Sequence, residues 1–131
     1  MGTLVTGTAA TYVEELWVNT DKRYQIMCIT RDVQNIVKQS GITDGIVLVN
    51  PMHITASCYV NDLESGLHHD IMNWLGKIAP FYGADGKDGE EYHHHRTGED
   101  NGDSHLKNLL IGSQVTIPVT NGRLDFGPWQ Q

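Results

Sequence analysis

The dipeptide Asn121-Gly122 stands between two stretches that alternate apolar and polar residues, VTIPVT before it and RLDF after it. Both residues tolerate the left-handed backbone that the tight turn of a β-hairpin requires. Such a turn pairs its flanking strands antiparallel, so residues 113–129 are expected to form a hairpin. This feature restricts the fold most, because any architecture for the chain must contain an antiparallel sheet.

Other short runs rich in β-branched and aromatic residues predict further strands. Residues 11–20 (TYVEELWVNT) and 23–30 (RYQIMCIT) are separated by a short polar segment and are expected to form a second hairpin. The apolar run GIVLVN over residues 45–50 indicates a buried strand. The segment HITASCYVN over residues 53–61 alternates well enough to predict another strand.

Three segments have the spacing of amphipathic helices. In residues 32–41, Asp32 is the expected cap and Gly41 the stop. Residues 64–80 give the clearest pattern, and residues 103–110 a shorter one capped by Asp103. The side chains expected to face inward on the last two helices are Leu67, Ile71, Trp74, Leu75, Ile78, Leu106, Leu109 and Leu110. The Gly- and acid-rich residues 81–92 between them are expected to form a long loop.

Strands interrupted by only two or three helices favour an α+β fold with mostly antiparallel sheets. A length of 131 residues suits a single domain, residues 1–131.

The formal charge of −7 argues against nucleic acid as a partner, since phosphate backbones attract basic surfaces. No apolar run is long enough to span a membrane, and the N-terminus lacks a signal pattern. Cys28 and Cys58 lie in apolar stretches and are expected to be reduced core residues, which suggests a cytoplasmic protein.

Residues 91–108, EYHHHRTGEDNGDSHLKN, hold four of the seven histidines. With His53, the imidazoles of His94 and His105 come from three separate segments, a common way to build a metal site with an open position. The alternative for the His triplet is a solvated loop. His94 and His105 do not have the spacing of a known metal motif.

Acidic residues cluster beside these histidines. Glu99, Asp100 and Asp103 precede or begin the 103–110 helix, where the helix dipole favours negative charge. A divalent cation would offset these carboxylates and would let a phosphate approach the same helix end. Capping remains the alternative for Asp103. Arg96, Lys107 and Arg123 are the cations nearest in sequence that could pair with a phosphate.

The order of several motifs resembles the YjbQ-like family, whose members are described as secondary thiamine-phosphate synthases. The resemblance covers about residues 8–131. Its most specific motifs are His53-x-Thr55, His94 to Gly98, Asp100-Asn101, Ser104-His105-Leu106, Ile117-Pro118-Val119, Gly122-Arg123-Leu124 and Trp129-Gln130.

This resemblance implies a small α+β protein with a β-sandwich-like core that assembles as a homotrimer. It also implies a polar pocket in which His53, His94 and His105 would hold a divalent metal, Zn or Mg. Asp70, Asp100 and Asn101 would be further polar groups of that pocket. Arg123 follows the tight turn and is either an exposed hairpin residue or a phosphate ligand that uses its bidentate fork. Among the triplet, His94 matches the family pattern because it lies two residues after Tyr92, so His93 and His95 are expected to be solvated neighbours.

The sequence departs from the family at its end. Pro128 occupies a position where a small hydroxylated residue is usual, and similar proteins continue through a further strand and an acidic, Arg-containing segment. A chain ending at Gln131 would lack that strand, and its neighbour would become an exposed edge.

Three functions are compatible with these residues. The first is a metal-assisted transferase that couples a pyrimidine diphosphate to a thiazole phosphate. The second is a metal-dependent hydrolase of a small substrate, with Asp100 as general base. The third is a non-enzymatic, trimeric metal- or metabolite-binding protein.

Overall fold

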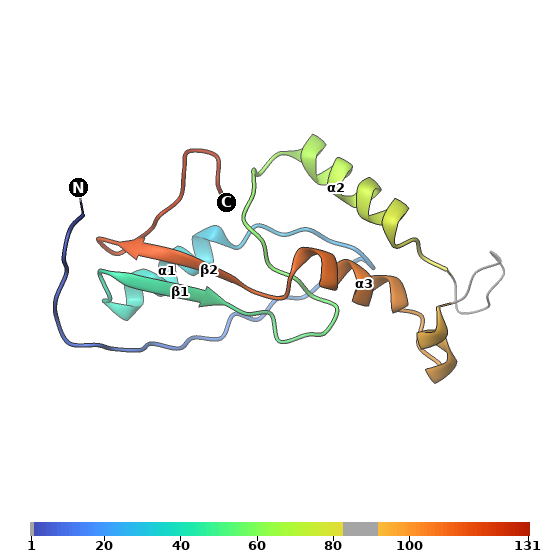
Figure 1. Cartoon of the computed structure of the whole chain (residues 1–131), viewed down its shortest axis with the longest axis horizontal. Helices are drawn as coiled ribbons and strands as arrows, with labels where there is room; N and C mark the ends of the chain where they lie inside the picture. Colours follow the sequence, from blue (N-terminus) through green and yellow to red (C-terminus); the bar gives the residue numbers. More distant parts are fainter. Residues whose placement is uncertain (1, 83–91) are drawn as a thin grey trace. The chain divides into compact units, whose positions relative to one another are not determined.

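The computed structural model describes residues 2–82 and 92–131 (Figure 1). The chain divides into two compact units. The hairpin unit consists of Met1–Leu48 and Thr116–Gln131, and the histidine unit consists of Val49–Val115. This division does not test the expected single domain of residues 1–131.

The sheet has three strands in the order β1-β2-β3: β1 (Gly45–Val49), β2 (Val115–Thr120) and β3 (Arg123–Leu124). The arrows of β1 and β2 point in opposite directions in Figure 1. β2 pairs antiparallel with β3, with Val119 opposite Leu124 and Thr120 opposite Arg123. Asn121 and Gly122 have φ angles of 52° and 70°, the left-handed values of the tight turn. The predicted hairpin is confirmed.

Helix α1 (Thr30–Ser40) packs on this hairpin. Val33 and Val37 of the helix and Ile117 and Val119 of β2 are the buried apolar side chains of the hairpin unit. The amide of Gln34 forms two hydrogen bonds, since its Nε2 donates to the Gly122 carbonyl and its Oε1 accepts from the Leu124 N–H, both at 3.0 Å.

The ends of α1 test two predictions. Gly41 follows the helix in the left-handed conformation, as predicted, with φ 68°. The expected cap at Asp32 is wrong, because the helix starts earlier: Ile29 precedes it, and Asp32 lies within the first turn. The helical spacing of the apolar side chains located the helix, but the polar cap did not locate its start.

Residues 2–29 form no strand, so the predicted hairpin over residues 11–30 is wrong. The segment has β-type residues, but it has no ladder partner among the described residues, and most of its large apolar side chains are exposed. Trp17 is 85% exposed and Val13 is 87% exposed. β-propensity stabilises a strand only where neighbouring strands and a packed face are available.

In the histidine unit, α2 (Ser65–Ile78) confirms the clearest helix prediction. The Glu64 carboxylate caps it by accepting from the N–H groups of Gly66 and Leu67, at 2.7 and 2.8 Å. These two bonds hold the pKa of Glu64 below its ordinary value. Of the predicted inward face only Leu75 is buried, whereas Trp74 and Ile78 are exposed, so that part of the prediction is wrong.

Residues 53–61 do not form the predicted strand. A turn occupies residues 53–55, in which the Ala56 N–H donates to the His53 carbonyl at 3.1 Å. The Ala56 carbonyl accepts from the side chain of Asn108. The N–H and carbonyl groups of Ala56, which a strand would use for its ladder, are therefore engaged in a turn and in a contact with a helix.

The short 3₁₀ helix η1 (His93–Thr97) leads into α3 (Gly102–Ile111). The α3 prediction is confirmed, but its predicted face is wrong: Leu106, Leu109 and Leu110 are exposed, and Gly102, Asp103 and Lys107 are buried. Most of the predicted 81–92 loop lies outside the described residues.

The fold is α+β with a small antiparallel sheet, as predicted. Among the described residues, no helix combines the length and the apolar character that crossing a membrane requires.

Candidate functional site

The start of α3 is fixed to η1 by a buried histidine. His95 is 6% exposed, and its Nε2 accepts a hydrogen bond from the Gly102 N–H at 3.2 Å. Its ring stands edge-on to Tyr92, with 5.4 Å between the ring centroids. The expectation that His95 is a solvated neighbour is wrong, because it satisfies one of the free N–H groups at the start of the helix.

Gly102 has no room for a side chain. A Cβ at this position would lie 2.9 Å from three atoms of Tyr92. The Tyr92 hydroxyl in turn donates to the Pro80 carbonyl at 2.8 Å. Glycine therefore lets η1, the first turn of α3 and the chain after α2 approach one another closely.

Two of the predicted metal ligands meet at this junction. The rings of His94 and His105 are in edge-to-face contact, with 4.6 Å between centroids and 78° between planes. His94 is exposed, whereas His105 is half-buried. The Nε2 atom of His105 is buried and has no hydrogen-bond partner among the described residues.

Asn101 lies directly before α3 and holds its first turn. Its carbonyl accepts from the N–H groups of Ser104 and His105, at 3.0 and 3.2 Å. Its side-chain Oδ1 is a second buried atom that lacks a hydrogen-bond partner among residues 2–82 and 92–131. Asp100 is half-buried beside it in the sequence. An unsatisfied amide oxygen and an unsatisfied imidazole nitrogen are two groups that a metal ion or a polar ligand would satisfy.

Asp103 and Lys107 form a buried ion pair instead of contributing to the site. Lys107 Nζ lies 2.5 Å from Asp103 Oδ2 and donates to the Ala79 carbonyl at 2.7 Å. Asp103 is fully buried, and α3 begins one residue before it. The predicted cap at Asp103 and the phosphate-binding role for Lys107 are therefore both wrong, since these groups neutralise each other.

His53 lies in the exposed turn of residues 53–55. The Thr55 N–H donates to His53 Nδ1 at 3.2 Å, and Thr55 Oγ1 lies 2.9 Å from the same nitrogen. Asp70 is exposed on α2. Neither residue joins the contact between His94 and His105.

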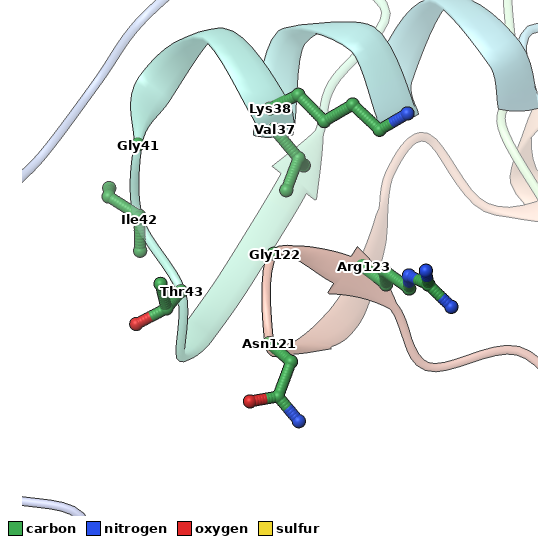
Figure 2. A pocket seen from close by; sticks show the side chains of 8 residues that line it. All are labelled: Val37, Lys38, Gly41, Ile42, Thr43, Asn121, Gly122 and Arg123. Atoms are coloured by element: carbon green, nitrogen blue, oxygen red, sulfur yellow. The ribbon is translucent and has the colours of Figure 1, made fainter.

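Arg123 belongs to the other unit. It lines a shallow hollow with Lys38 and the turns that follow α1 and β2, and Figure 2 shows both cationic side chains extending to the same side. All eight residues that line this hollow come from the hairpin unit. The phosphate-binding role of Arg123 stays a prediction.

A metal fits this site in part. Within the described residues, no group of three or more His, Cys, Asp and Glu side chains is arranged to hold an ion. His94 and His105 would supply two imidazoles, and Asn101 an amide oxygen, which is a donor set suited to a divalent cation. The predicted three-histidine site is not assembled from the described residues of one chain.

Cys58 is a poor candidate for a nucleophile. It is half-buried, and burial raises the pKa of its thiol. Burial raises the pKa of the neighbouring Tyr59 in the same way. Cys28 is exposed rather than a core residue, and both cysteines are free.

The sequence reasoning missed the roles of His95 and Asn108. Asn108 lies three residues after His105, so the helical period places both on one side of α3, and this spacing could have indicated it. No local pattern distinguishes His95 from His93, because its burial depends on contacts with Tyr92 and Gly102.

Comparisons with known proteins agree with this fold. Residues 14–131 match the family model described as "UPF0047 protein YjbQ-like". A UPF0047 protein of Archaeoglobus fulgidus is 38% identical over 117 residues, which is 89% of this chain and 84% of that protein. A UPF0047 protein of Methanothermobacter thermautotrophicus is 35% identical over 119 residues, 91% of this chain and 78% of the relative.

Solved structures give the same result. A YbjQ-like protein of unknown function from Sulfolobus solfataricus superposes with a TM-score of 0.75 at 31% identity, covering 86% of this chain and 76% of the other. An uncharacterized conserved protein of the YjbQ/UPF0047 family from Clostridium acetobutylicum also gives 0.75, at 32% identity, with 86% and 81% coverage.

Proposed function

The chain belongs to the YjbQ-like UPF0047 family, and from that premise we propose that it is a thiamine-phosphate-synthase-like transferase. The reaction would couple a pyrimidine diphosphate to a thiazole phosphate and release diphosphate. One observation carries the proposal: His94 and His105 meet at the start of α3, where His105 Nε2 and Asn101 Oδ1 are buried without partners among the described residues.

The reaction requires no covalent bond between the protein and either substrate. The bond between the pyrimidine methylene carbon and the diphosphate oxygen breaks, and the thiazole nitrogen supplies the electron pair for the new carbon–nitrogen bond. No protein nucleophile is needed, which agrees with Cys58, where burial raises the pKa of the thiol. The protein must orient two substrates and stabilise the charge on the departing diphosphate.

His94, His105 and Asn101 would hold a divalent metal, and a bound metal would neutralise charge on the diphosphate. The half-buried Asp100, next to Asn101, would hold or orient polar groups of the substrate. Asp70 stays a candidate for the same role from α2. The close approach at Gly102 keeps the start of α3 rigid, so the two imidazoles are positioned before the substrate binds.

We propose that the protein acts as a homotrimer in the cytoplasm. Assembly is supported by large apolar side chains that are exposed among the described residues, such as Trp17, Leu109 and Trp129. The free thiols of Cys28 and Cys58 fit a reducing compartment. Sedimentation equilibrium would test the assembly, and a mass of one chain would contradict it.

The test is product formation from both thiamine precursors with Mg²⁺ or Zn²⁺ added. We expect thiamine phosphate, and we expect His105→Ala to lower its rate by roughly ten- to a hundredfold, because the variant lacks a group proposed to hold the metal. His93→Ala is the matched control, because His93 is exposed on the same 3₁₀ helix. Equal rates for wild type and His105→Ala would remove the site assignment.

A protein that retains stoichiometric metal but forms no product under these conditions would instead be a non-enzymatic metal-binding protein. That outcome would overturn the transferase proposal.

A further inference from the structure

The hydrogen bonds of His53 determine which ring nitrogen carries its proton. The Thr55 N–H donates to His53 Nδ1 at 3.2 Å, and Thr55 Oγ1, which can donate or accept, lies 2.9 Å from the same nitrogen. Because a backbone N–H can only donate, this geometry favours Nδ1 as the acceptor. In a neutral imidazole the other nitrogen is then the protonated one. His53 therefore presents an N–H group at Nε2, and the ring is exposed to solvent.

This arrangement is the reverse of what a metal ligand needs. A histidine that binds metal through Nε2 keeps its proton on Nδ1 and donates it to an acceptor. At His53 a proton on Nδ1 would face the Thr55 N–H, which is itself a donor, and would have Thr55 Oγ1, at 2.9 Å, as its acceptor.

The position of His53 is set by Asn108. Asn108 Nδ2 donates to the Ala56 carbonyl and to Ser57 Oγ, the latter at 3.1 Å. The Ala56 N–H closes the turn on the His53 carbonyl at 3.1 Å. Since Asn108 lies one helical turn beyond His105, these bonds connect the turn that carries His53 to the His105 side of α3.

We infer that His53 binds a phosphate oxygen of the substrate through its Nε2–H, rather than ligating the metal, and that Asn108 is the residue that positions it. The inference rests on the proposed function, because the two precursors of that reaction both carry phosphate groups. Phosphate oxygens are strong acceptors, and they match an exposed donor held in a fixed turn.

Two substitutions of His53 distinguish a hydrogen-bond donor to phosphate from a metal ligand. In His53→Gln the side-chain amide can place an N–H group near the position of Nε2, but the imidazole is lost. His53→Ala removes both the N–H donor and the imidazole. The probes are inorganic pyrophosphate, titrated by calorimetry without added metal, and Co²⁺, titrated by its visible absorption.

We expect His53→Ala to weaken pyrophosphate binding about tenfold and His53→Gln to stay within about threefold of wild type. Co²⁺ affinity should be unchanged in both variants. If both variants instead lose Co²⁺ affinity, His53 is a metal ligand and the inference is overturned. Unchanged pyrophosphate binding in His53→Ala also overturns it.

The tautomer can be measured directly by nitrogen-15 NMR of labelled histidines. We expect the Nε2–H form for His53 in the wild-type protein, and in Thr55→Ala, which keeps the backbone N–H. Addition of Zn²⁺ should shift the signals of His94 and His105 and leave His53 unchanged. An Nδ1–H form whose Nε2 responds to Zn²⁺ would contradict the inference.

Asn108 is tested by a double-mutant cycle with His53. If Asn108 acts through His53, Asn108→Ala weakens pyrophosphate binding alone and adds no loss in the His53→Ala background. Ser57→Ala, which leaves the contact with the Ala56 carbonyl, is the matched control and should bind within about twofold of wild type. An equal loss from Asn108→Ala in both backgrounds would show a general structural role and overturn the positioning role.

These outcomes are separable from the coupling reaction. Pyrophosphate binding through His53 without formation of thiamine phosphate removes the proposed function and leaves the inference. Product formation at the wild-type KM in His53→Ala removes the inference and leaves the function.

Discussion

The described residues of the two units bury different kinds of side chain. In the hairpin unit the buried side chains are apolar: Val33, Val37, Ile117 and Val119. In the histidine unit, Leu75 and Ala79 share the interior with His95, Asp103 and Lys107, while the leucines of α3 are exposed. The hairpin unit thus gains stability mainly from apolar burial, and the histidine unit depends on satisfied polar contacts.

Apolar burial and buried polar contacts respond differently to substitution. An apolar side chain that is shortened leaves a cavity, whose cost depends on how far the neighbours relax. A buried ion pair that loses one partner leaves a charge without compensation, which costs more. Polar interiors also fix geometry, because hydrogen bonds have preferred distances and directions. This agrees with the presence of the candidate site in the histidine unit.

The largest expected effect comes from breaking the buried ion pair. Asp103→Ala leaves the Lys107 ammonium buried and is expected to lower the free energy of unfolding by about 3–5 kcal/mol. Urea denaturation followed by circular dichroism measures this loss. Replacing both residues with leucine removes both charges and should cost clearly less than the single change. A loss below about 1 kcal/mol for Asp103→Ala would show that the pair contributes little.

The corresponding change in the hairpin unit is smaller. Val119→Ala removes two methyl groups from the buried side of β2 and is expected to cost about 2 kcal/mol. Thr116→Ala, at an exposed position of the same strand, should cost less than about 0.5 kcal/mol. Amide hydrogen exchange would locate the loss of protection in α1 and the hairpin. Equal effects of the two changes would mean that β2 has no buried side.

Gly102 and Gly122 are required for different reasons: a side chain at Gly102 would clash with a neighbour, whereas Gly122 has a left-handed backbone. Gly102→Ala places a Cβ against Tyr92, and Gly122→Ala places one at a φ of 70°; each should cost about 1–2 kcal/mol in thermal or urea unfolding.

Asparagine distinguishes the two causes, because it tolerates left-handed backbone. Gly122→Asn should recover most of the loss seen with alanine, whereas Gly102→Asn should be at least as damaging as Gly102→Ala. Recovery at Gly102 would contradict the close packing against Tyr92.

The sequence predicts α1 and the β2–β3 hairpin well for a local reason. It also locates β1, but the expected burial of that strand is wrong, since Ile46 is 73% and Leu48 54% exposed. Asn121-Gly122 determines the turn, and the alternation of Ile117 and Val119 with exposed neighbours determines the buried side of β2. Residues 11–30 show the limit of the same reasoning. Their composition is typical of strands, but a strand also needs a neighbour, and sequence composition does not reveal whether one is present.

The candidate site was predictable only in part. The helical period predicts α3 and places His105 on it, and the resemblance indicates His94, which does contact His105. The inward face of α3 was not predictable from hydropathy, because Lys107 is buried through a pairing with Asp103 and with a carbonyl 28 residues earlier in the chain. The tautomer of His53 likewise depends on the turn geometry at Thr55.

The smallest expected effect is a pH dependence at the start of α2. Glu64 accepts from two backbone N–H groups, which lowers its pKa in the folded state below the ordinary value of 4.5. A group with a lowered folded pKa contributes stability that is present above 4.5 and is lost as the pH falls through the folded value.

Glu64→Gln keeps an acceptor oxygen for the cap but does not titrate, so its unfolding midpoint should change less between pH 6 and about pH 3 than that of wild type. The decisive quantity is the difference between the two pH profiles, because the other carboxylates titrate in both proteins. Superimposable profiles would show that the α2 cap, unlike the buried ion pair of α3, does not couple the histidine unit's stability to charge.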